Sequence, residues 1–200
     1  MASREHSFDE ISETLKTAGS ALRDNEIPYL LGGSLAFWAH GGPERRKDLD
    51  FMVKPEDADR ALDALEAAGL RPEKPPEGWL YKAWDGDVLV DLIFHPTGME
   101  IDDEVIARGQ DLEVLAMPIR VMALEDVLCT KLLAFHEHNL DYSSVLQMAR
   151  ALREKVDWQQ VRTRTDKSPF ARAFFTMIEG TGVIGEGGPA EASGRTEVRV

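Results

Sequence analysis

The chain has 200 residues, of which 43% are hydrophobic and 30% are charged, so it is long enough for one sizeable core, or for one domain with a smaller lobe. Its formal net charge of −13 argues against broad, sequence-independent nucleic-acid binding, which relies on a basic surface, and leaves cationic small molecules open as substrates. No apolar run approaches the ~20 residues that span a bilayer, the first residues lack the apolar core of a secretion signal, and the single Cys129 excludes an internal disulfide. These features predict a cytoplasmic protein without membrane contact.

The first half of the chain is expected to alternate helices with short strands. Hydrophobic residues recur at helical spacing, or form brief apolar runs, in five segments. These segments predict helices at 7–24, 35–40 and 56–68, and strands at 27–31 and 48–53. Gly32 and Gly33 make a turn after the first strand, and Ser34 is the expected N-cap of the helix that follows.

The second half of the chain begins with a hairpin and continues as helices. Asp85-Gly86-Asp87 separates two apolar runs, which is a good hairpin signal, and the segment before them is rich in proline and charge. The expected elements are a loop at 71–78, hairpin strands at 79–84 and 88–94, a strand at 119–122, and helices at 123–137, 143–155 and from 158 or 168 to 179.

This order, with the strands first and the helices afterwards, predicts an α/β (α+β) fold. We expect a mixed sheet flanked by helices in a first domain of residues 1–122, followed by a C-terminal helical lobe of residues 123–180. Residues 181–200 are Gly-rich and polar without hydrophobic periodicity, so they are expected to form a disordered tail. A substrate would lie in the cleft between the domain and the lobe.

Carboxylates in two of the predicted strands mark a candidate metal site. Asp48 and Asp50 are two residues apart and lie on one face of their strand, because strand side chains alternate. Asp48 and Asp50 could instead be a strand cap and a surface residue. That alternative does not explain Asp91, which stands within the apolar run Val-Asp-Leu-Ile-Phe. Three carboxylates brought together cannot all stay ionised without a counter-charge. A pair of Mg²⁺ ions supplies that charge, so Asp48, Asp50 and Asp91 are the candidate ligands.

The turn at Gly32-Gly33-Ser34 is the candidate phosphate site. The two glycines allow a tight turn and a close backbone approach to phosphate, and Ser34 would donate its hydroxyl at the positive end of the helix. By itself the same sequence would make an ordinary strand-to-helix turn. In combination with the three carboxylates, it indicates nucleotidyl transfer from a nucleoside triphosphate (NTP).

These motifs resemble a known superfamily. Leu31-Gly32-Gly33-Ser34, followed by Asp48-Leu49-Asp50, resembles the DNA polymerase β-type nucleotidyltransferases. Further along, Lys131-Leu132-Leu133-Ala134-Phe135, with Asp141-Tyr142 after it, resembles the third and fourth motifs of the AbiEii-type nucleotidyltransferase toxins. The resemblance covers roughly residues 27–152. It implies a nucleotidyltransferase-type mixed sheet, a helical lobe after it, and the binding of two Mg²⁺ ions and an NTP.

Three further residues have expected roles in the site, and each also has an ordinary structural alternative. Lys131 would reach the triphosphate as a point charge, although a lysine in such a helix usually extends to solvent. Asp141 would act as a general base or form an ion pair with Lys131, and its ordinary alternative is a helix N-cap. Arg46 would contact a phosphate or the acceptor, and its alternative is a place in a solvated charged loop.

The chain departs from the toxin pattern at two places. That pattern usually has an arginine four residues before the first aspartate and a threonine two residues before it, where this chain has Glu44 and Arg46. The basic residue common late in the lysine motif is also absent, and His136-Glu137-His138 stands there. Histidines two residues apart on a helix do not point the same way, so no zinc site is expected.

Three functional hypotheses follow. The first is a Mg²⁺-dependent nucleotidyltransferase that is the toxin of a toxin–antitoxin pair, with tRNA as acceptor and an antitoxin protein as partner, as the resemblance implies. The second is an enzyme resembling aminoglycoside or lincosamide nucleotidyltransferases, which the net acidity favours. The third is a non-catalytic binding module that retains the fold, against which the three carboxylates argue. Trp79, Tyr81 and Trp84 would pack across the hairpin or stack on a base.

Overall fold

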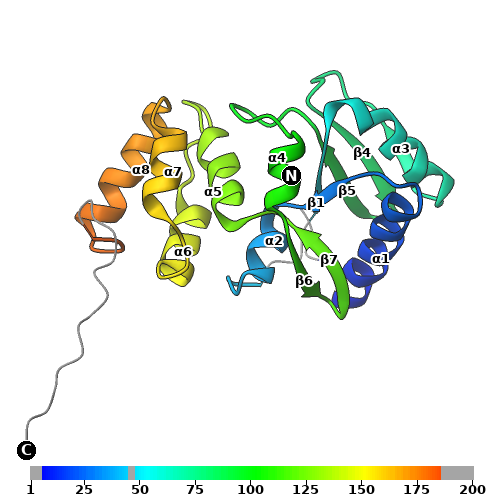
Figure 1. Cartoon of the computed structure of the whole chain (residues 1–200), viewed down its shortest axis with the longest axis horizontal. Helices are drawn as coiled ribbons and strands as arrows, with labels where there is room; N and C mark the ends of the chain where they lie inside the picture. Colours follow the sequence, from blue (N-terminus) through cyan, green and yellow to red (C-terminus); the bar gives the residue numbers. More distant parts are fainter. Residues whose placement is uncertain (1–5, 45–47, 186–200) are drawn as a thin grey trace, which may run out of the picture.

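The computed structural model describes residues 6–44 and 48–185, in which seven strands form one sheet, some of the eight α-helices pack against it, and the last helices form a group beside it (Figure 1). The strands are β1 (Tyr29–Leu31), β2 (Leu49–Val53), β3 (Arg71–Glu73), β4 (Leu80–Asp85), β5 (Val88–Ile93), β6 (Gln110–Val114) and β7 (Met117–Val121). The helices are α1 (Phe8–Asp24), α2 (Gly33–Ala39), α3 (Ala58–Ala67), α4 (Asp103–Arg108), α5 (Leu124–Leu133), α6 (Ser143–Leu152), α7 (Trp158–Thr165) and α8 (Pro169–Gly180).

The sheet is mixed, with the strand order β3-β4-β5-β2-β1-β7-β6. β2 pairs with β5 and β1 pairs with β7 in parallel, whereas the other neighbouring pairs are antiparallel. The predicted fold class, a mixed sheet flanked by helices and followed by further helices, is confirmed. Within the described ranges, no helix has the length and apolarity needed to cross a membrane.

Elements with strong local signals form where they are predicted. Helix α1 begins with a capping box, in which the Ser7 side chain accepts from the Glu10 amide and the Glu10 side chain accepts from the Ser7 amide. The hairpin of β4 and β5 closes with Asp85 opposite Val88, and Gly86 takes the left-handed conformation, φ +58°, that a tight hairpin turn requires.

Several predicted boundaries are wrong. The expected loop at 71–78 begins with the edge strand β3, where Pro72 is tolerated because an edge strand leaves one row of backbone groups unpaired. Helix α4 and strand β6 were not predicted, because short polar segments carry little periodic signal. The helix expected to reach residue 137 ends at Leu133, and a turn closed by the backbone of His136 and Asn139 follows it.

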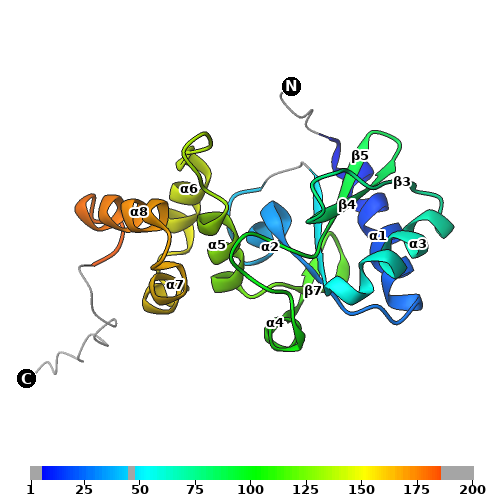
Figure 2. The same ribbon diagram turned by 90° about the horizontal axis from the view of Figure 1, so that it is seen from above.

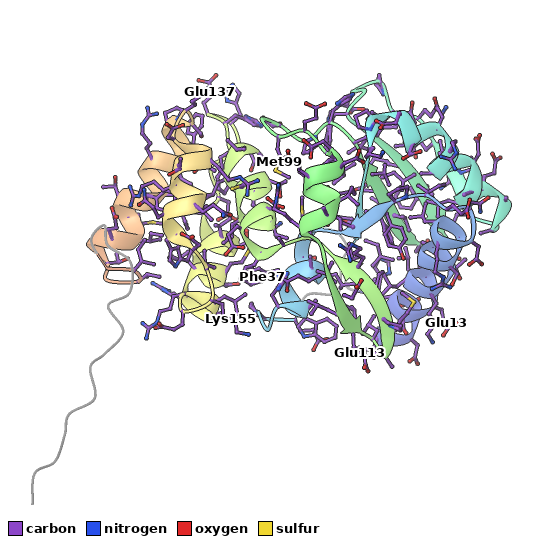
Figure 3. The ribbon with its side chains drawn as sticks, viewed as in Figure 1. Glu13, Phe37, Met99, Glu113, Glu137 and Lys155 are labelled. Carbon is purple, nitrogen blue, oxygen red and sulfur yellow. The ribbon has the colours of Figure 1, made fainter. Side chains whose placement is uncertain are left out.

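The two faces of the sheet are covered differently. Helices α1 and α3 pack against β4 and β5 on one face and against each other (Figure 2). Helix α2 contacts β2 and also α5, so it lies between the sheet and the helices that follow. Phe37, on α2, is fully buried in this layer (Figure 3). The face of β3, β4 and β5 that is turned away from α1 and α3 is therefore the one left open for a site.

A buried carboxylate joins the sheet part to helices α5–α8, which lie on the left in Figure 1. Asp126 of α5 is fully buried and binds two arginines: Arg108 of α4, through its Nε at 3.1 Å, and Arg164 of α7, through its Nη2 at 2.5 Å. Met99 lies at the same junction and accepts a weak hydrogen bond from Arg164 (Figure 3). Three separate segments of the chain thus meet at one carboxylate.

The end of the described chain remains attached to helix α8. Val183 is buried, and its amide donates to the Ile178 carbonyl. The first residues of the predicted tail 181–200 therefore belong to the helical lobe, and residues 186–200 lie outside the described part of the chain. The domain boundary expected at residue 122 stays a prediction.

Asp126→Asn is expected to destabilise the protein by about 2 kcal/mol, or roughly 4–8 °C in melting temperature, because two arginines lose their buried counter-charge. Asp111→Asn is the matched control: it breaks the pair with Arg120, but Asp111 is exposed and the expected change is below about 0.5 kcal/mol. Thermal unfolding of both variants tests this, and equal melting temperatures would contradict it.

Candidate active site

A row of charged side chains crosses four strands on the open face of the sheet. Glu73 of β3 lies opposite Lys82 of β4, Lys82 lies opposite Asp91 of β5, and Asp91 lies opposite Asp50 of β2. Directly opposed residues on neighbouring strands project from the same face, so these four side chains form one line, here called the polar row. The sheet register thereby brings two of the predicted metal ligands side by side.

Two carboxylates of the polar row, those of Asp50 and Asp91, lie where their negative charge is disfavoured. Burial raises the pKa of Asp50 to about 6; Lys131 and Lys82 oppose this shift, and Asp91 and Asp48 add to it. Burial also raises the pKa of Asp91, against a hydrogen bond of 3.0 Å from Lys82 Nζ to Asp91 Oδ1. A cation placed between the carboxylates would relieve this unfavourable charge.

Gly33 lies directly against the Asp50 side chain. A Cβ added to Gly33 would stand 1.7 Å from Asp50 Oδ2, and the φ of +57° at Gly33 is one that side chains rarely adopt. The Gly32 amide donates to the Asp50 carbonyl at 2.7 Å, which holds the turn beside β2. The predicted phosphate turn and the predicted metal ligand are therefore in contact, and only glycine allows it.

The helix after this turn starts earlier than predicted. Gly32 is the N-cap of α2, and Ser34 lies within the helix instead of capping it. The first helical hydrogen bond runs from the Ala36 amide to the Gly32 carbonyl, because the glycines let the chain turn sharply at once. The Ser34 side chain therefore does not cap the helix, and its role toward phosphate stays a prediction.

The lysine predicted from the toxin-like motif influences the charge of Asp50, and its role toward the triphosphate stays a prediction. Lys131 is on α5, far from β2 in the sequence, yet its charge is the main opposing influence on the pKa of Asp50. Asp141 lies in the connection to α6, where its Oδ1 accepts from the Ser143 amide at 2.9 Å, as a residue at a helix start does. Its predicted role as a base or as the partner of Lys131 stays a prediction.

The donor set suits a hard cation such as Mg²⁺. Asp50 and Asp91 offer carboxylate oxygens from adjacent strands, and Asp48 precedes Asp50 by two residues. In residues 6–44 and 48–185, no three His, Cys, Asp or Glu side chains already form a group that could hold a metal ion. The carboxylate chemistry of these residues and the raised pKa values of Asp50 and Asp91 fit the ion. Their role as ligands is a proposal. Arg46 lies outside the described residues.

Two members of the polar row were not predicted as site residues. Lys82 forms the ion pair with Asp91, and Glu73 is near enough to raise the Asp91 pKa. The hairpin signal could have placed Lys82, because a two-residue loop at Gly86 and Asp87 sets Lys82 opposite Asp91. Glu73 had no such signal, since its strand was expected to be a loop.

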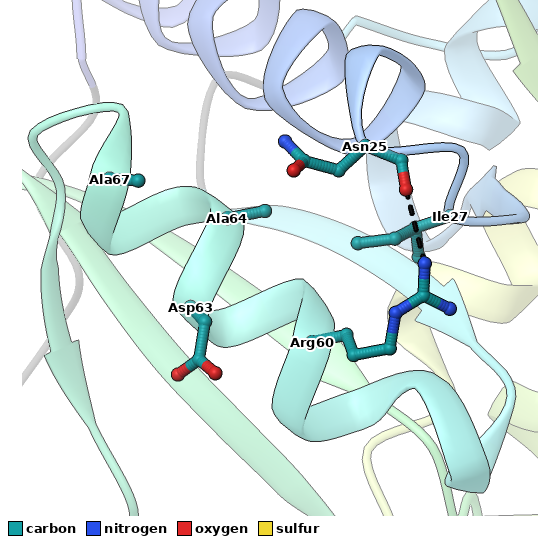
Figure 4. A pocket seen from close by; sticks show the side chains of 6 residues that line it. All are labelled: Asn25, Ile27, Arg60, Asp63, Ala64 and Ala67. Carbon is teal, nitrogen blue, oxygen red and sulfur yellow. Dashed lines mark hydrogen bonds between the residues drawn. The ribbon is translucent and has the colours of Figure 1, made fainter.

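A small open pocket of about 260 Å³ lies elsewhere, between the end of α1 and helix α3 (Figure 4). Arg60 crosses it and donates to the Asn25 carbonyl at 3.1 Å. Its lining residues are Asn25, Ile27, Arg60, Asp63, Ala64 and Ala67. It shares no residue with the polar row, and α3 covers the opposite face of the sheet, so this pocket is separate from the candidate site.

Adjacent carboxylates on a mixed sheet, beside a glycine turn and a lysine, are typical of enzymes that transfer nucleotides. Residues 8–181 match the model of a family described as uncharacterised nucleotidyltransferases, and the chain belongs to that family. The predicted nucleotidyltransferase superfamily and the predicted enzyme class are thereby confirmed, and the hypothesis of a non-catalytic module loses its support. A search of curated protein sequences found no match.

The fold is also similar to solved structures of antibiotic-modifying proteins. The crystal structure of ANT(2″)-Ia in complex with adenylyl-2″-tobramycin has a TM-score of 0.58 and 16% identity, over 82% of this chain and 98% of that one. The solution structure of this antibiotic-resistance factor has a TM-score of 0.57 and 15% identity, over 86% and 96% of the two chains. The lincomycin-bound lincosamide antibiotic adenylyltransferase LnuA has a TM-score of 0.50 and 12% identity, over 72% and 96%. Such low identities establish a shared fold alone, and the resemblance to AbiEii-type toxins stays a prediction.

Gly33→Ala is expected to abolish most nucleotidyl transfer, because the new Cβ displaces the Asp50 carboxylate. Gly86→Ala is the matched control: Gly86 has nearly the same φ, +58°, but nothing lies within 4 Å of its added Cβ. Both variants should lose about 1 kcal/mol of stability from the strained backbone, and only Gly33→Ala should lose more stability together with its activity. Melting temperatures and initial rates test this, and an active Gly33→Ala enzyme would contradict the contact.

The stability of the metal-free protein should fall as the pH rises from about 4 through about 6. Asp50 keeps its proton to a higher pH in the folded chain, with a pKa of about 6, than in the unfolded chain, whose value is near 3.8. Asp50→Asn removes this dependence, so the variant should be more stable than the wild type by about 1–3 kcal/mol at pH 8 and nearly equal to it at pH 4. Urea unfolding in EDTA at both pH values tests this, and parallel pH profiles for the two proteins would refute it.

Proposed function

We propose that the protein transfers a nucleoside monophosphate from an NTP to an acceptor hydroxyl in a Mg²⁺-dependent reaction. The observation that carries this proposal is the meeting of Asp50 with Asp91, Gly33 and Lys131 at one point of the sheet. Asp48, Asp50 and Asp91 would hold two Mg²⁺ ions, which supply charge neutralisation of the triphosphate and of the attacking oxygen. Such chemistry needs few protein groups beyond those that position the reactants.

The remaining residues of the site have distinct proposed roles. The backbone amides of Gly32-Gly33-Ser34 would bind the β- and γ-phosphates, with Lys131 as a point charge on the same phosphates. The acceptor oxygen would form a bond to the α-phosphorus while the bond to the pyrophosphate oxygen breaks. Asp141 would take the hydroxyl proton as a general base, or would hold Lys131 in place.

A cationic small molecule is the acceptor class we favour. The net charge of −13 attracts cations and disfavours polyanions. Two solved structures of the same fold hold adenylyl-2″-tobramycin and lincomycin, respectively. The similarity extends over 98% and 96% of the lengths of these two proteins, so it includes nearly the whole of their fold. We therefore place the antibiotic-like acceptor ahead of the tRNA acceptor.

A toxin that modifies tRNA, with an antitoxin protein as its partner, is the second candidate. The observation in its favour is that Lys131, predicted from the toxin-like motif, does lie near Asp50. The departures at Glu44 and Arg46 count against transfer of the toxins' substrate to this chain. The acceptor assay below separates the two candidates.

Transfer of label from each α-labelled NTP should require Mg²⁺ and should fall at least about 100-fold in Asp50→Asn and in Lys131→Met, because each loses charge at the reacting phosphates. Asp87→Asn, in the exposed hairpin turn, and Lys167→Met, on the exposed surface, are the matched controls and should stay near wild type. Tobramycin, lincomycin and bulk tRNA are the acceptors to offer.

Label on tobramycin or lincomycin would support the favoured acceptor class, and label only on tRNA would support the toxin. Full activity of Asp50→Asn, or activity in EDTA equal to that in Mg²⁺, would contradict the proposed function itself. Circular dichroism of each variant shows whether a lost activity reflects a lost fold.

A further inference from the structure

A second row of side chains lies beside the polar row on the same face of the sheet. Arg71 of β3 is opposite Trp84 of β4, and Trp84 is opposite Leu89 of β5. Trp84 follows Lys82 by two residues, so both side chains project from the face that carries Asp91. Trp84 is then the diagonal neighbour of Asp91, at about 7–8 Å between Cα atoms.

The indole of Trp84 is held in place by two polar side chains. Its Nε1 donates to Glu73 Oε2 at 3.0 Å, and the Arg71 guanidinium carbon lies 5.6 Å from the centroid of the ring. Trp84 nevertheless remains partly exposed. An aromatic ring fixed at its edge and on one face, beside a catalytic carboxylate, is a platform for a ligand. Arg71, Glu73 and Trp84 are here called the Trp84 platform.

The in-line geometry of nucleotidyl transfer indicates that the acceptor would lie on the side of the Trp84 platform. In the proposed function, the leaving phosphates would lie on the side of Gly33, which follows β1 and contacts Asp50. In phosphoryl transfer the attacking and leaving oxygens stand roughly in line on opposite sides of the phosphorus. Across the strand order β1-β2-β5-β4-β3, the side opposite β1 is that of β4 and β3, which carry the platform.

We propose that the Trp84 platform binds the acceptor, and that the acceptor is a hydroxylated ring bearing amino groups. This inference rests on the proposed function and adds the surface that selects its substrate. The ring C–H groups would lie on the indole, and the Glu73 carboxylate would accept from ring hydroxyl or ammonium groups. On this face the carboxylates of Glu73 and Asp91 balance the charges of Arg71 and Lys82, so it lacks the excess of positive charge that a nucleic-acid backbone requires.

Trp79 provides a matched control in the same hairpin. Its side chain is 42% exposed, and it precedes β4, outside the paired register that holds Lys82 and Trp84. Its backbone carbonyl accepts from the Phe94 amide, an interaction that a substitution to alanine retains. Trp79→Ala thus removes an indole from the hairpin without touching the platform.

The experiment measures steady-state transfer from labelled ATP to tobramycin, with 2-deoxystreptamine and bulk tRNA as alternative acceptors. Trp84→Ala is expected to raise the KM for tobramycin about 10-fold or more, while the KM for ATP and the kcat change less than about 3-fold. Trp84→Phe keeps an aromatic face and should recover most of the loss. Glu73→Gln should raise the KM for tobramycin while leaving the ring in place, and Trp79→Ala should match the wild type.

An unchanged KM for tobramycin in Trp84→Ala, or an equal rise in Trp79→Ala, would overturn the proposal. Transfer to tRNA alone would overturn it as well. Binding of each Mg²⁺-NTP is measured separately by thermal shift. Wild-type protein that binds a Mg²⁺-NTP but modifies neither amino ring overturns the acceptor inference and leaves the transfer function standing. Absence of a thermal shift with every Mg²⁺-NTP means that the proposed function itself has failed.

Discussion

The contact between the Asp50 carboxylate and Gly33 is the constraint on which the rest of the site depends. Asp50 Oδ2 occupies the space that any side chain at position 33 would need, and the Gly32 amide ties the same turn to the backbone of Asp50. The turn that would bind phosphate and the strand that would bind metal are therefore set relative to each other by direct contact. A site that must hold both ends of one triphosphate benefits from this fixed spacing.

The charge balance of the site favours the binding of a cation. Along the polar row, the ammonium group of Lys82 stands between the carboxylates of Glu73 and Asp91, and Lys131 faces Asp50. These lysines offset only part of the unfavourable charge, since the pKa of Asp50 still lies near 6. A stability penalty of this kind is common at functional sites, where groups are placed for chemistry and not for the free energy of folding.

The site also depends on how the helices after the sheet are anchored. Helix α5 carries both Lys131 and Asp126, and Asp126 binds arginines from α4 and α7. At the far end, Lys155 donates to the His40 carbonyl just after α2 (Figure 3). The helices after the sheet are thus attached to the sheet part at two places, through Asp126 of α5 and through Lys155 after α6.

Strong local signals were sufficient to predict the capped helix α1, the Asp-Gly hairpin, and the carboxylates Asp48, Asp50 and Asp91 as candidate ligands. These followed from alternation and spacing within single segments, which fix the face on which a side chain lies. The start of α2, the edge strand β3 and helix α4 were missed, because glycine turns and short polar segments have weak periodicity. The folded chain was needed to show that Lys131 influences the pKa of Asp50, that Glu73 and Trp84 lie near Asp91, and that Asp126 binds arginines of two other helices. The physical reason is that such contacts unite segments far apart in the chain, and their positions depend on strand order, register and the burial of whole helix faces.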